Sequence, residues 1–255
     1  PDLFSDSLYV HYDDAAARHL FEVSAGLDSA VPGEHEILGQ VRDAWEVARG
    51  EGTARRTLNL LFRQAVEVGK RARTETRIAR HVTSVSQAAV LLAGEALGGH
   101  SADIADDAAL AATARGLEGR RALLVGAGSM ARGMASFLVD AGVDELVIAN
   151  RTAARAEELA GALLDRLAAP EQSGAVTVRS GGLDLVDPAL REVDVLLTAT
   201  NAPDAVIGLD QIERALADRD RQLHLVDVGV PRDVDPAVAR LEGVEVLDMD
   251  DVAAM

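Results

Sequence analysis

The strongest chemical signal in the sequence is a glycine-rich turn that joins an apolar run to a helical pattern. The turn reads Gly-Ala-Gly-Ser-Met-Ala at 126–131 and follows the apolar run at 122–125. Gly126 permits a tight turn, Gly128 lets the backbone approach a pyrophosphate, and Ala131 allows the helix to pack near the strand. Because a helix N-terminus presents free N–H groups to phosphate, we expect this turn to bind a dinucleotide through Gly126, Gly128, Ser129 and Met130.

The end of the next apolar run indicates which dinucleotide is bound. Enzymes that use NAD usually place Asp or Glu there, where it binds the ribose 2′-hydroxyl. This chain instead reads Asn150-Arg151-Thr152, and the guanidinium of Arg151 suits a 2′-phosphate. Arg155 lies one helical turn later and can assist. The pattern predicts NADPH as the cofactor, and an arginine that merely begins a surface helix is the alternative.

Two later turns are further candidates for cofactor contacts. Thr200 and Asn201 follow the apolar run at 193–197, and Gly229 follows the run at 223–226. Ligands of open parallel sheets bind at the carboxyl ends of the strands. We therefore expect Thr200 and Asn201 to contact the ribose next to the nicotinamide and Gly229 to admit the nicotinamide, with ordinary turn chemistry as the alternative.

These turns require a sheet that brings them together, and the second half of the chain predicts one. Apolar runs alternate with helical patterns at 130–140, 153–167 and 210–217, and further runs lie at 146–149, 244–247 and, more weakly, 176–178. Continuous apolar strands with helices between them predict a parallel sheet covered on both faces, and right-handed crossovers make it a doubly wound, Rossmann-type α/β fold.

The first part of the chain is mainly helical instead. Apolar residues recur at helical spacing over 14–24, 36–49, 57–73, 84–97 and 106–114. We therefore predict two domains, a helical one over 1–115 and a dinucleotide-binding one over 116–251.

The composition excludes several functions. A net charge of −17 opposes general affinity for nucleic acid, yet residues 42–80 hold ten basic against five acidic residues, which indicates either a solvated helix face or a local phosphate-binding surface. The chain has no cysteine, which excludes disulfides, thiolate metal sites and a cysteine nucleophile within these residues, and no metal site is expected. Without a long apolar stretch or a visible export signal, we expect no membrane association and a cytoplasmic location.

Several segments, in order along nearly the whole chain, match one enzyme family. They are His19–Phe21, Gly26–Ser29, Gly33-Glu34, Ile37–Val41, Gly69–Thr76, Ser84–Ser86, Gly126–Gly128, Asn150–Thr152, Asp227–Asp233 and Asp248–Asp251. In these segments the sequence closely resembles glutamyl-tRNA reductase. The resemblance implies an enzyme that uses NADPH to reduce the glutamyl ester of tRNA(Glu) to glutamate-1-semialdehyde, the first committed step of tetrapyrrole (porphyrin) synthesis. It also implies a cysteine nucleophile that forms a thioester, from which hydride releases the aldehyde.

By the same resemblance, five residues of the helical part belong to the active site. His19 is the implied catalytic residue, which polarises the reacting carbonyl or moves protons. The implied substrate-binding residues are Ser29, Glu34, Gln40 and Ser84. Glu34 accepts the ammonium of the substrate glutamate, and Ser29 or Gln40 donates to its oxygens. The alternatives are a surface histidine at 19, a helix N-terminal charge at 34 and a helix N-cap at 84.

The resemblance also indicates that this chain is a central fragment. The family's cysteine lies upstream of the segment that contains His19, and its dimerisation domain follows Asp251, so we expect residues 1–115 to be the second half of a catalytic domain and the isolated chain to be inactive. Ala30 and Pro32 depart from the family's usual apolar residues. The expected partners are tRNA(Glu) charged with glutamate and the downstream aminomutase.

Two other functions stay open at this point. One is a shikimate-dehydrogenase-like NADP oxidoreductase, which needs a catalytic Lys–Asp pair, although Lys70 is the sole lysine and lies in a basic helical run. The other is a non-catalytic NADPH-binding module.

Overall fold

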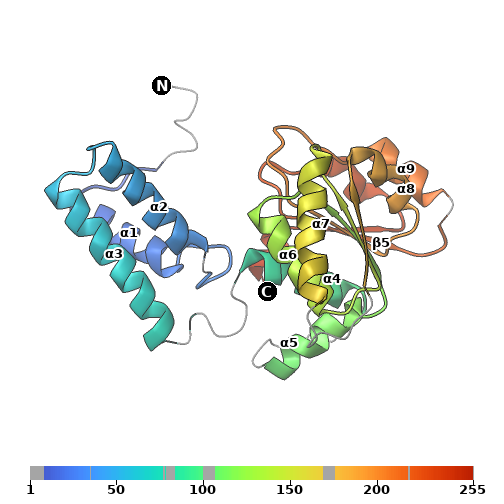
Figure 1. Ribbon diagram of the computed structural model, residues 1–255, viewed down its shortest axis with the longest axis horizontal. Helices are drawn as coiled ribbons and strands as arrows, with labels where there is room; N and C mark the ends of the chain where they lie inside the picture. Colours follow the sequence, from blue (N-terminus) through green and yellow to red (C-terminus); the bar gives the residue numbers. More distant parts are fainter. Residues whose placement is uncertain are drawn as a thin grey trace. The chain divides into compact units, whose positions relative to one another are not determined.

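The computed structural model describes residues 9–34, 36–76, 78, 84–99, 107–168, 176–217 and 219–254. The chain divides into two compact units, Pro1–Ser84 and Val85–Met255 (Figure 1). The sequence places this division after residue 115. In the structure, the two helices before that point, α4 (Val85–Ala96) and α5 (Asp107–Ala114), belong to the unit that contains the sheet.

The first unit packs three helices against one another: α1 (Asp13–Ala25), α2 (Glu36–Gly50) and α3 (Arg56–Glu75). Each begins and ends close to a helix predicted from apolar periodicity. The longest, α3, buries Ala65, Val66 and Gly69 along one side and leaves its charged residues exposed except Arg73, which is half-buried. This division of one helix into an apolar and a charged side is what amphipathic spacing produces.

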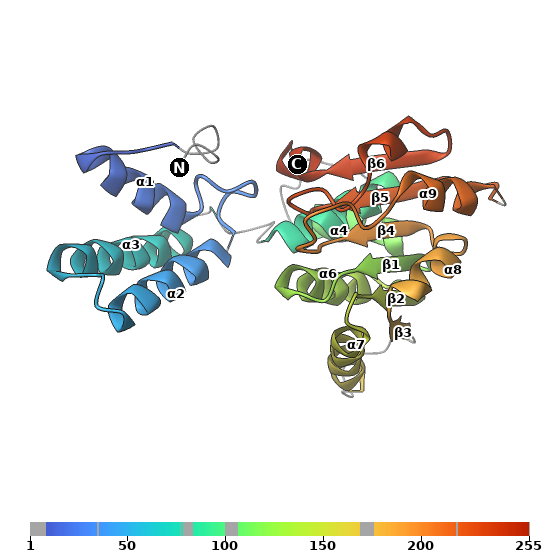
Figure 2. The same cartoon turned by 90° about the horizontal axis from the view of Figure 1, so that it is seen from above.

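The second unit contains a six-stranded parallel sheet in the order β3-β2-β1-β4-β5-β6. Figure 2 shows the strands in this order. The strands are β1 (Arg121–Val125), β2 (Glu145–Ala149), β3 (Thr177–Gly181), β4 (Val195–Thr198), β5 (Leu223–Asp227) and β6 (Val244–Asp248). This order confirms the doubly wound, Rossmann-type fold. The chain reverses direction across the sheet between β1 and β4, and open sheets of this kind bind ligands at that point.

Helices cover both faces of the sheet because its central strands are apolar on both sides. On one face, α6 (Ser129–Asp140) contacts both α4 and α7 (Ala153–Leu167) (Figure 1). On the other, α8 (Val186–Leu190) and α9 (Leu209–Leu216) join a core with alternate strand residues that are fully buried, Leu123, Leu196 and Leu225. Burial of each such leucine contributes about 1.5–3 kcal/mol. The last helix, α10 (Met249–Ala254), follows β6.

A hydrogen bond fastens α4 to the start of α6. Ser86 Oγ donates to the carbonyl of Met130 at 3.0 Å and lies against Gly133, where an added Cβ would come within 2.7 Å of that hydroxyl oxygen. These contacts with α4 fix the position of α6, the helix that follows the phosphate turn.

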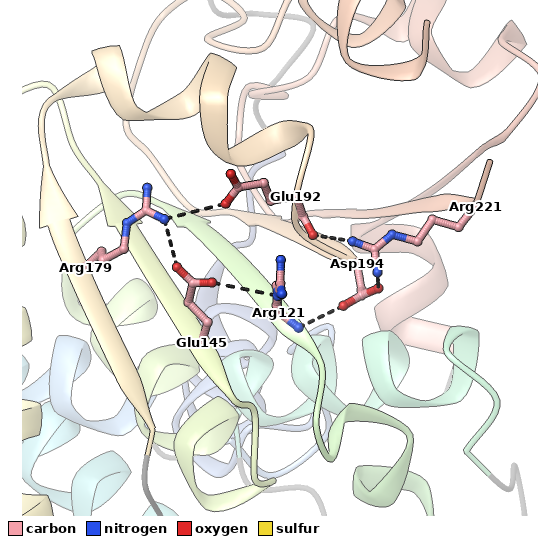
Figure 3. Close-up of polar contacts among 6 residues, drawn as sticks. All are labelled: Arg121, Glu145, Arg179, Glu192, Asp194 and Arg221. Carbon is pink, nitrogen blue, oxygen red and sulfur yellow. Dashed lines mark hydrogen bonds and ion pairs between the residues drawn. The ribbon is translucent and has the colours of Figure 1, made fainter. Parts of the chain in front are cut away.

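Charged residues connect the strands at their amino ends, the edge opposite the phosphate turn (Figure 3). The buried carboxylate of Asp194 pairs with Arg221 at 2.6 Å and accepts the backbone N–H of Arg121 at 2.9 Å. Arg179 pairs with Glu145 at 2.9 Å. We assign this network a structural role, because it fixes strand ends that lie away from the ligand-binding edge.

Candidate functional site

The turns that follow β1, β2, β4 and β5 meet at the carboxyl edge of the sheet and surround an open cleft of about 410 Å³. Nearly all the residues predicted to bind the cofactor line it: Gly126, Gly128, Ser129, Met130, Asn150, Arg151, Thr152, Arg155, Thr200 and Asn201. Gly229 does not line the cleft, although Val228 and Val230 on either side of it do. The structure therefore brings three separate sequence signals into one site and places the fourth, Gly229, beside it.

The two glycines of the phosphate turn differ in what surrounds them. Gly126 has a φ of +123°, and a Cβ there would lie 2.2 Å from the carbonyl oxygen of Ala199. Gly128 precedes α6, and a Cβ there would meet no atom within 4 Å. Gly126 is thus required by the fold, whereas Gly128 leaves open the space through which a phosphate would approach the first turn of α6. This arrangement fits a dinucleotide.

The charge of the cleft comes from arginine alone. Among the described residues that line it, Arg151 and Arg155 are the only ionisable ones, and both are exposed. Asn150 shapes the turn by donating from Nδ2 to the carbonyl of Thr152 at 2.9 Å. Although the chain has a net charge of −17, this end of the cleft is a local site for anions, because none of the described residues that line it is a carboxylate.

Two buried aspartates lie behind the cleft wall opposite Arg151. The sequence analysis did not single them out. Asp227 ends β5, and Asp233 accepts a 2.7 Å hydrogen bond from the backbone N–H of Thr200. Burial raises the pKa of the Asp233 carboxyl, the hydrogen bonds from Thr200 lower it, and the charge of Asp227 raises it. The available signal was that the segment 227–233 has an aspartate at each end.

In the helical unit, His19 lies beside the loop that follows α1. Its Nε2 is 3.2 Å from the hydroxyl of Tyr9, and its Nδ1 is 3.8 Å from the carboxylate of Asp28. The ring of His11 lies 4.6 Å away, centroid to centroid. The imidazole therefore has a polar group near each ring nitrogen, and Asp28 is followed directly by the predicted substrate residue Ser29.

In this loop a buried carboxylate, Glu34, accepts a hydrogen bond from the half-buried Ser29. Glu34 is 6% exposed. Burial raises the pKa of its carboxyl, the charge of Glu36 raises it further, and the Ser29 hydrogen bond and the Arg73 charge lower it. The structure thus places a partly desolvated carboxylate beside a hydroxyl donor, a combination that can hold an ammonium group.

Arg73, which the sequence analysis did not propose, holds both ends of this loop. Its guanidinium donates to the carbonyls of Ser24 at 2.8 Å and Gly69 at 2.9 Å, and also to the carbonyl of Glu34. Burial lowers the pKa of Arg73, and the charge of Glu34 raises it. Ser24 precedes the loop, Glu34 lies near its end, and Gly69 belongs to α3, the helix that carries Arg73. Arg73 therefore fastens the loop to α3 and fixes the position of Glu34.

The other predicted residues of this unit lie apart from that pair. Gln40 is exposed on α2, and in the described part of the chain no hydrogen bond joins it to Ser29 or Glu34. Ser84 is half-buried and immediately precedes α4. Ala30 and Pro32 are exposed in the loop. Among the described residues, no three His, Cys, Asp or Glu side chains gather as metal ligands, and no helix is long and apolar enough to cross a membrane.

Comparisons with known proteins match both units. A family model described as the N-terminal domain of glutamyl-tRNA(Glu) reductase matches residues 1–76, and one described as shikimate / quinate 5-dehydrogenase matches residues 109–255. Glutamyl-tRNA reductase of Salinispora arenicola is 42% identical over 258 residues, which cover 100% of this chain and 50% of that protein. The relative from Rubrobacter xylanophilus is 41% identical and covers 99% of this chain and 52% of its own length.

A solved structure gives the same result. Glutamyl-tRNA reductase from Methanopyrus kandleri matches with a TM-score of 0.53 and 38% identity, over 99% of this chain and 56% of that one. The chain spans about half the length of these relatives. The shikimate-dehydrogenase alternative is not favoured, because the first unit matches the reductase model and Lys70, the sole lysine, is exposed on α3. The chain belongs to the glutamyl-tRNA reductase family, and its Rossmann-type unit is of the shikimate / quinate 5-dehydrogenase type.

Proposed function

We propose that this chain binds NADPH in the cleft of its second unit, as part of an enzyme that reduces glutamyl-tRNA(Glu) to glutamate-1-semialdehyde in tetrapyrrole biosynthesis. The observation that carries the cofactor proposal is the lining of the cleft, in which Arg151 and Arg155 are the only ionisable side chains that the structure describes. A guanidinium forms strong, charge-assisted hydrogen bonds with phosphate oxygens. NADH carries only a ribose hydroxyl at that position, so it gains no such bond.

When bound, NADPH supplies the hydride that reduces an acyl carbonyl. In the second unit, the first turn of α6 binds the pyrophosphate, while Thr200 and Asn201 orient the ribose next to the nicotinamide. In the first unit, His19 holds a proton near the carbonyl oxygen. Glu34 binds the ammonium of the glutamyl group, whose positive charge favours the ionised carboxylate and so offsets the cost of burial. Ser29 donates to an oxygen of the same group.

The covalent step needs a thiolate that these 255 residues do not contain, because the sequence has no cysteine. We therefore expect the purified chain to bind cofactor and yet to form neither a thioester nor glutamate-1-semialdehyde from glutamyl-tRNA and NADPH. Sustained turnover by this chain would show that a cysteine is not the nucleophile.

Recognition of the acyl group can be tested separately from chemistry. We expect the chain to bind glutamyl-tRNA(Glu) more tightly than uncharged tRNA(Glu), and Glu34→Gln to remove that difference. Glu22→Gln, which makes the same change at an exposed position of α1, is the matched control. Equal affinity of the wild-type chain for charged and uncharged tRNA would contradict the proposed role of Glu34.

The wider assignments belong to the same proposal. We place the reaction in the cytoplasm, with tRNA(Glu) as the carrier of the substrate and the downstream aminomutase as the protein that receives the reactive aldehyde. We also propose that the intact protein is dimeric.

A further inference from the structure

Two buried aspartates support the cleft wall that faces Arg151. Asp227 is 2% exposed and Asp233 is 0% exposed, and neither lines the cleft itself. Arg232, next to Asp233 in the sequence, pairs instead with Asp248 at 2.6 Å. A buried carboxylate is costly unless hydrogen bonds replace the water that it loses. The partners of these two carboxylates therefore show what they hold in place.

Asp227 holds the backbone that leads away from β5. Its Oδ1 accepts hydrogen bonds from the Thr198 hydroxyl at 2.8 Å and from the backbone N–H of Gly229 at 2.9 Å. The same oxygen accepts the N–H of Asp233 at 3.3 Å, and Oδ2 accepts that of Val234 at 3.0 Å. One side chain thus fixes the segment from 228 to 234 against the end of β4.

Asp233 joins that segment to the turn after β4. Its carboxylate accepts both the backbone N–H and the hydroxyl of Thr200, and the Thr200 oxygen in turn accepts the N–H of Ala202 at 3.1 Å. Its Oδ2 also packs against Gly229, where a Cβ would lie only 2.6 Å away. Gly229 is therefore required for the approach of the Asp233 carboxylate, which explains why a glycine stands beside the cleft without lining it.

The two segments held in this way form one end of the cleft. Thr200, Asn201 and Ala202 line it from one segment, and Val228 and Val230 line it from the other. The opposite end is formed, after β2, by Asn150, Arg151, Thr152 and Arg155. A dinucleotide spans such a crevice with one half at each end, so the half that lies over Thr200 is the one without the 2′-phosphate.

We propose that Asp233, with Asp227 behind it, is a positioning residue that sets the nicotinamide end of the cleft without touching the cofactor. This inference rests on the proposed binding of NADPH in the cleft. It makes a prediction opposite in sign to that of simple electrostatics. Removal of a negative charge near an anionic ligand should tighten binding through the Coulomb term alone, whereas loss of the positioning contacts should weaken it.

The test compares two ligands on Asp233→Asn. The amide cannot accept both hydrogen bonds from Thr200, and it turns one acceptor into a donor that faces an N–H or O–H group. We expect the Kd for NADPH to rise by about tenfold or more, the effect of leaving a buried group unsatisfied. The Kd for adenosine 2′,5′-bisphosphate, which lacks the nicotinamide half, should change by less than about twofold, because its contacts lie at the Arg151 end. The fluorescence of bound NADPH, which reports the surroundings of the nicotinamide, should change as well.

Two further variants keep the test decisive. Asp204→Asn makes the same substitution at an exposed position after Pro203 and controls for the change in charge. Thr198→Val removes a buried hydroxyl that donates to Asp227, at a residue that does not line the cleft, and it should also weaken NADPH more than the bisphosphate. This second variant decides the question if Asp233→Asn does not fold.

Each outcome has a distinct meaning. Selective loss of NADPH affinity supports the proposal. Equal loss for both ligands shows that Asp233 only stabilises the fold, and unchanged or tighter NADPH binding shows that it does not position the wall; either result overturns the proposal. If the wild-type chain binds neither ligand, the proposed cofactor function fails first and this inference fails with it.

Discussion

The two glycines of the phosphate turn should respond in opposite ways to the same substitution. In Gly126→Ala, the new Cβ would lie 2.2 Å from the Ala199 carbonyl oxygen, on a residue with a φ of +123°. Such a backbone conformation alone costs on the order of 1–3 kcal/mol for a residue with a side chain, and the contact forces the ends of β1 and β4 apart. We expect a total loss of about 3 kcal/mol, which lowers the Tm of a unit of this size by roughly 6–12 °C.

Gly128→Ala should leave the fold intact. The residue has a φ of −79° and a ψ of −169°, values that alanine adopts freely, and no atom lies within 4 Å of the added Cβ. Because alanine loses less backbone entropy on folding, stability should rise by about 0.4–1 kcal/mol. The methyl group would occupy the space through which the pyrophosphate approaches, so the Kd for NADPH should rise by about tenfold or more, a cost of about 1.4 kcal/mol.

Thermal unfolding and NADPH titration of the two variants, measured side by side, check this reasoning. Loss of stability in Gly126→Ala, together with loss of affinity and a small gain of stability in Gly128→Ala, is the expected pair of results. The account of the turn is refuted if Gly126→Ala unfolds at the wild-type temperature, or if Gly128→Ala binds NADPH as tightly as the wild-type chain does.

Three further predictions concern other parts of the chain. Asp194→Ala should lower stability by about 1–3 kcal/mol in denaturant titrations, because it removes the acceptor of a backbone N–H and the partner of an arginine at a buried position. Arg63→Glu combined with Lys70→Glu, both exposed on α3, should weaken tRNA binding and flatten its salt dependence; unchanged binding at two salt concentrations would show that α3 is only a solvated face. Burial and Glu36 raise the pKa of Glu34, so the folded state holds this proton more tightly than the unfolded state. Stability should therefore fall as the pH rises above the usual value of 4.5, and Glu34→Gln should flatten that decline in thermal unfolding measured across the pH range.

The tRNA prediction depends on which arginines are available. The basic stretch at 42–80 contains Arg71 and Arg77 as well as Arg63 and Lys70. In the structure, Arg71 pairs with Glu75 at 2.9 Å, and Arg77 lies outside the described residues. The substitution at Arg63 and Lys70 is therefore the sharper test of the basic face.

The sheet and its cofactor end could be predicted from the sequence because the information there is local. Four apolar runs become buried central strands, and the turn at 126–131 lies at a strand end as expected. The helix α8 was missed because its five residues are too few to show a period. The predicted domain boundary after residue 115 was inferred only from where the helical pattern ends. Apolar residues on α4 show that it is buried, but they do not show that α6 and β5 are what it packs against.

The residues that the sequence could not supply act over long separations. Arg73 donates to a carbonyl 49 positions earlier, and Asp233 accepts from a residue 33 positions earlier. Both are charged residues in segments that otherwise resemble an exposed helix end and a turn. Their role follows from burial and from the partners that burial forces on them, and neither property can be read from spacing along the chain.

The central claim, that the cleft is built for NADPH, is tested most directly by titrating the wild-type chain and Arg151→Ala with NADPH and NADH. The exposed Arg191, which does not line the cleft, provides the matched control Arg191→Ala. Hydrogen bonds to a charged group contribute about 1.5–3 kcal/mol, so NADPH should bind about tenfold to a hundredfold more tightly than NADH. Arg151→Ala should lose most of that preference while keeping its affinity for NADH. Equal dissociation constants for the two cofactors in the wild-type chain would contradict the account.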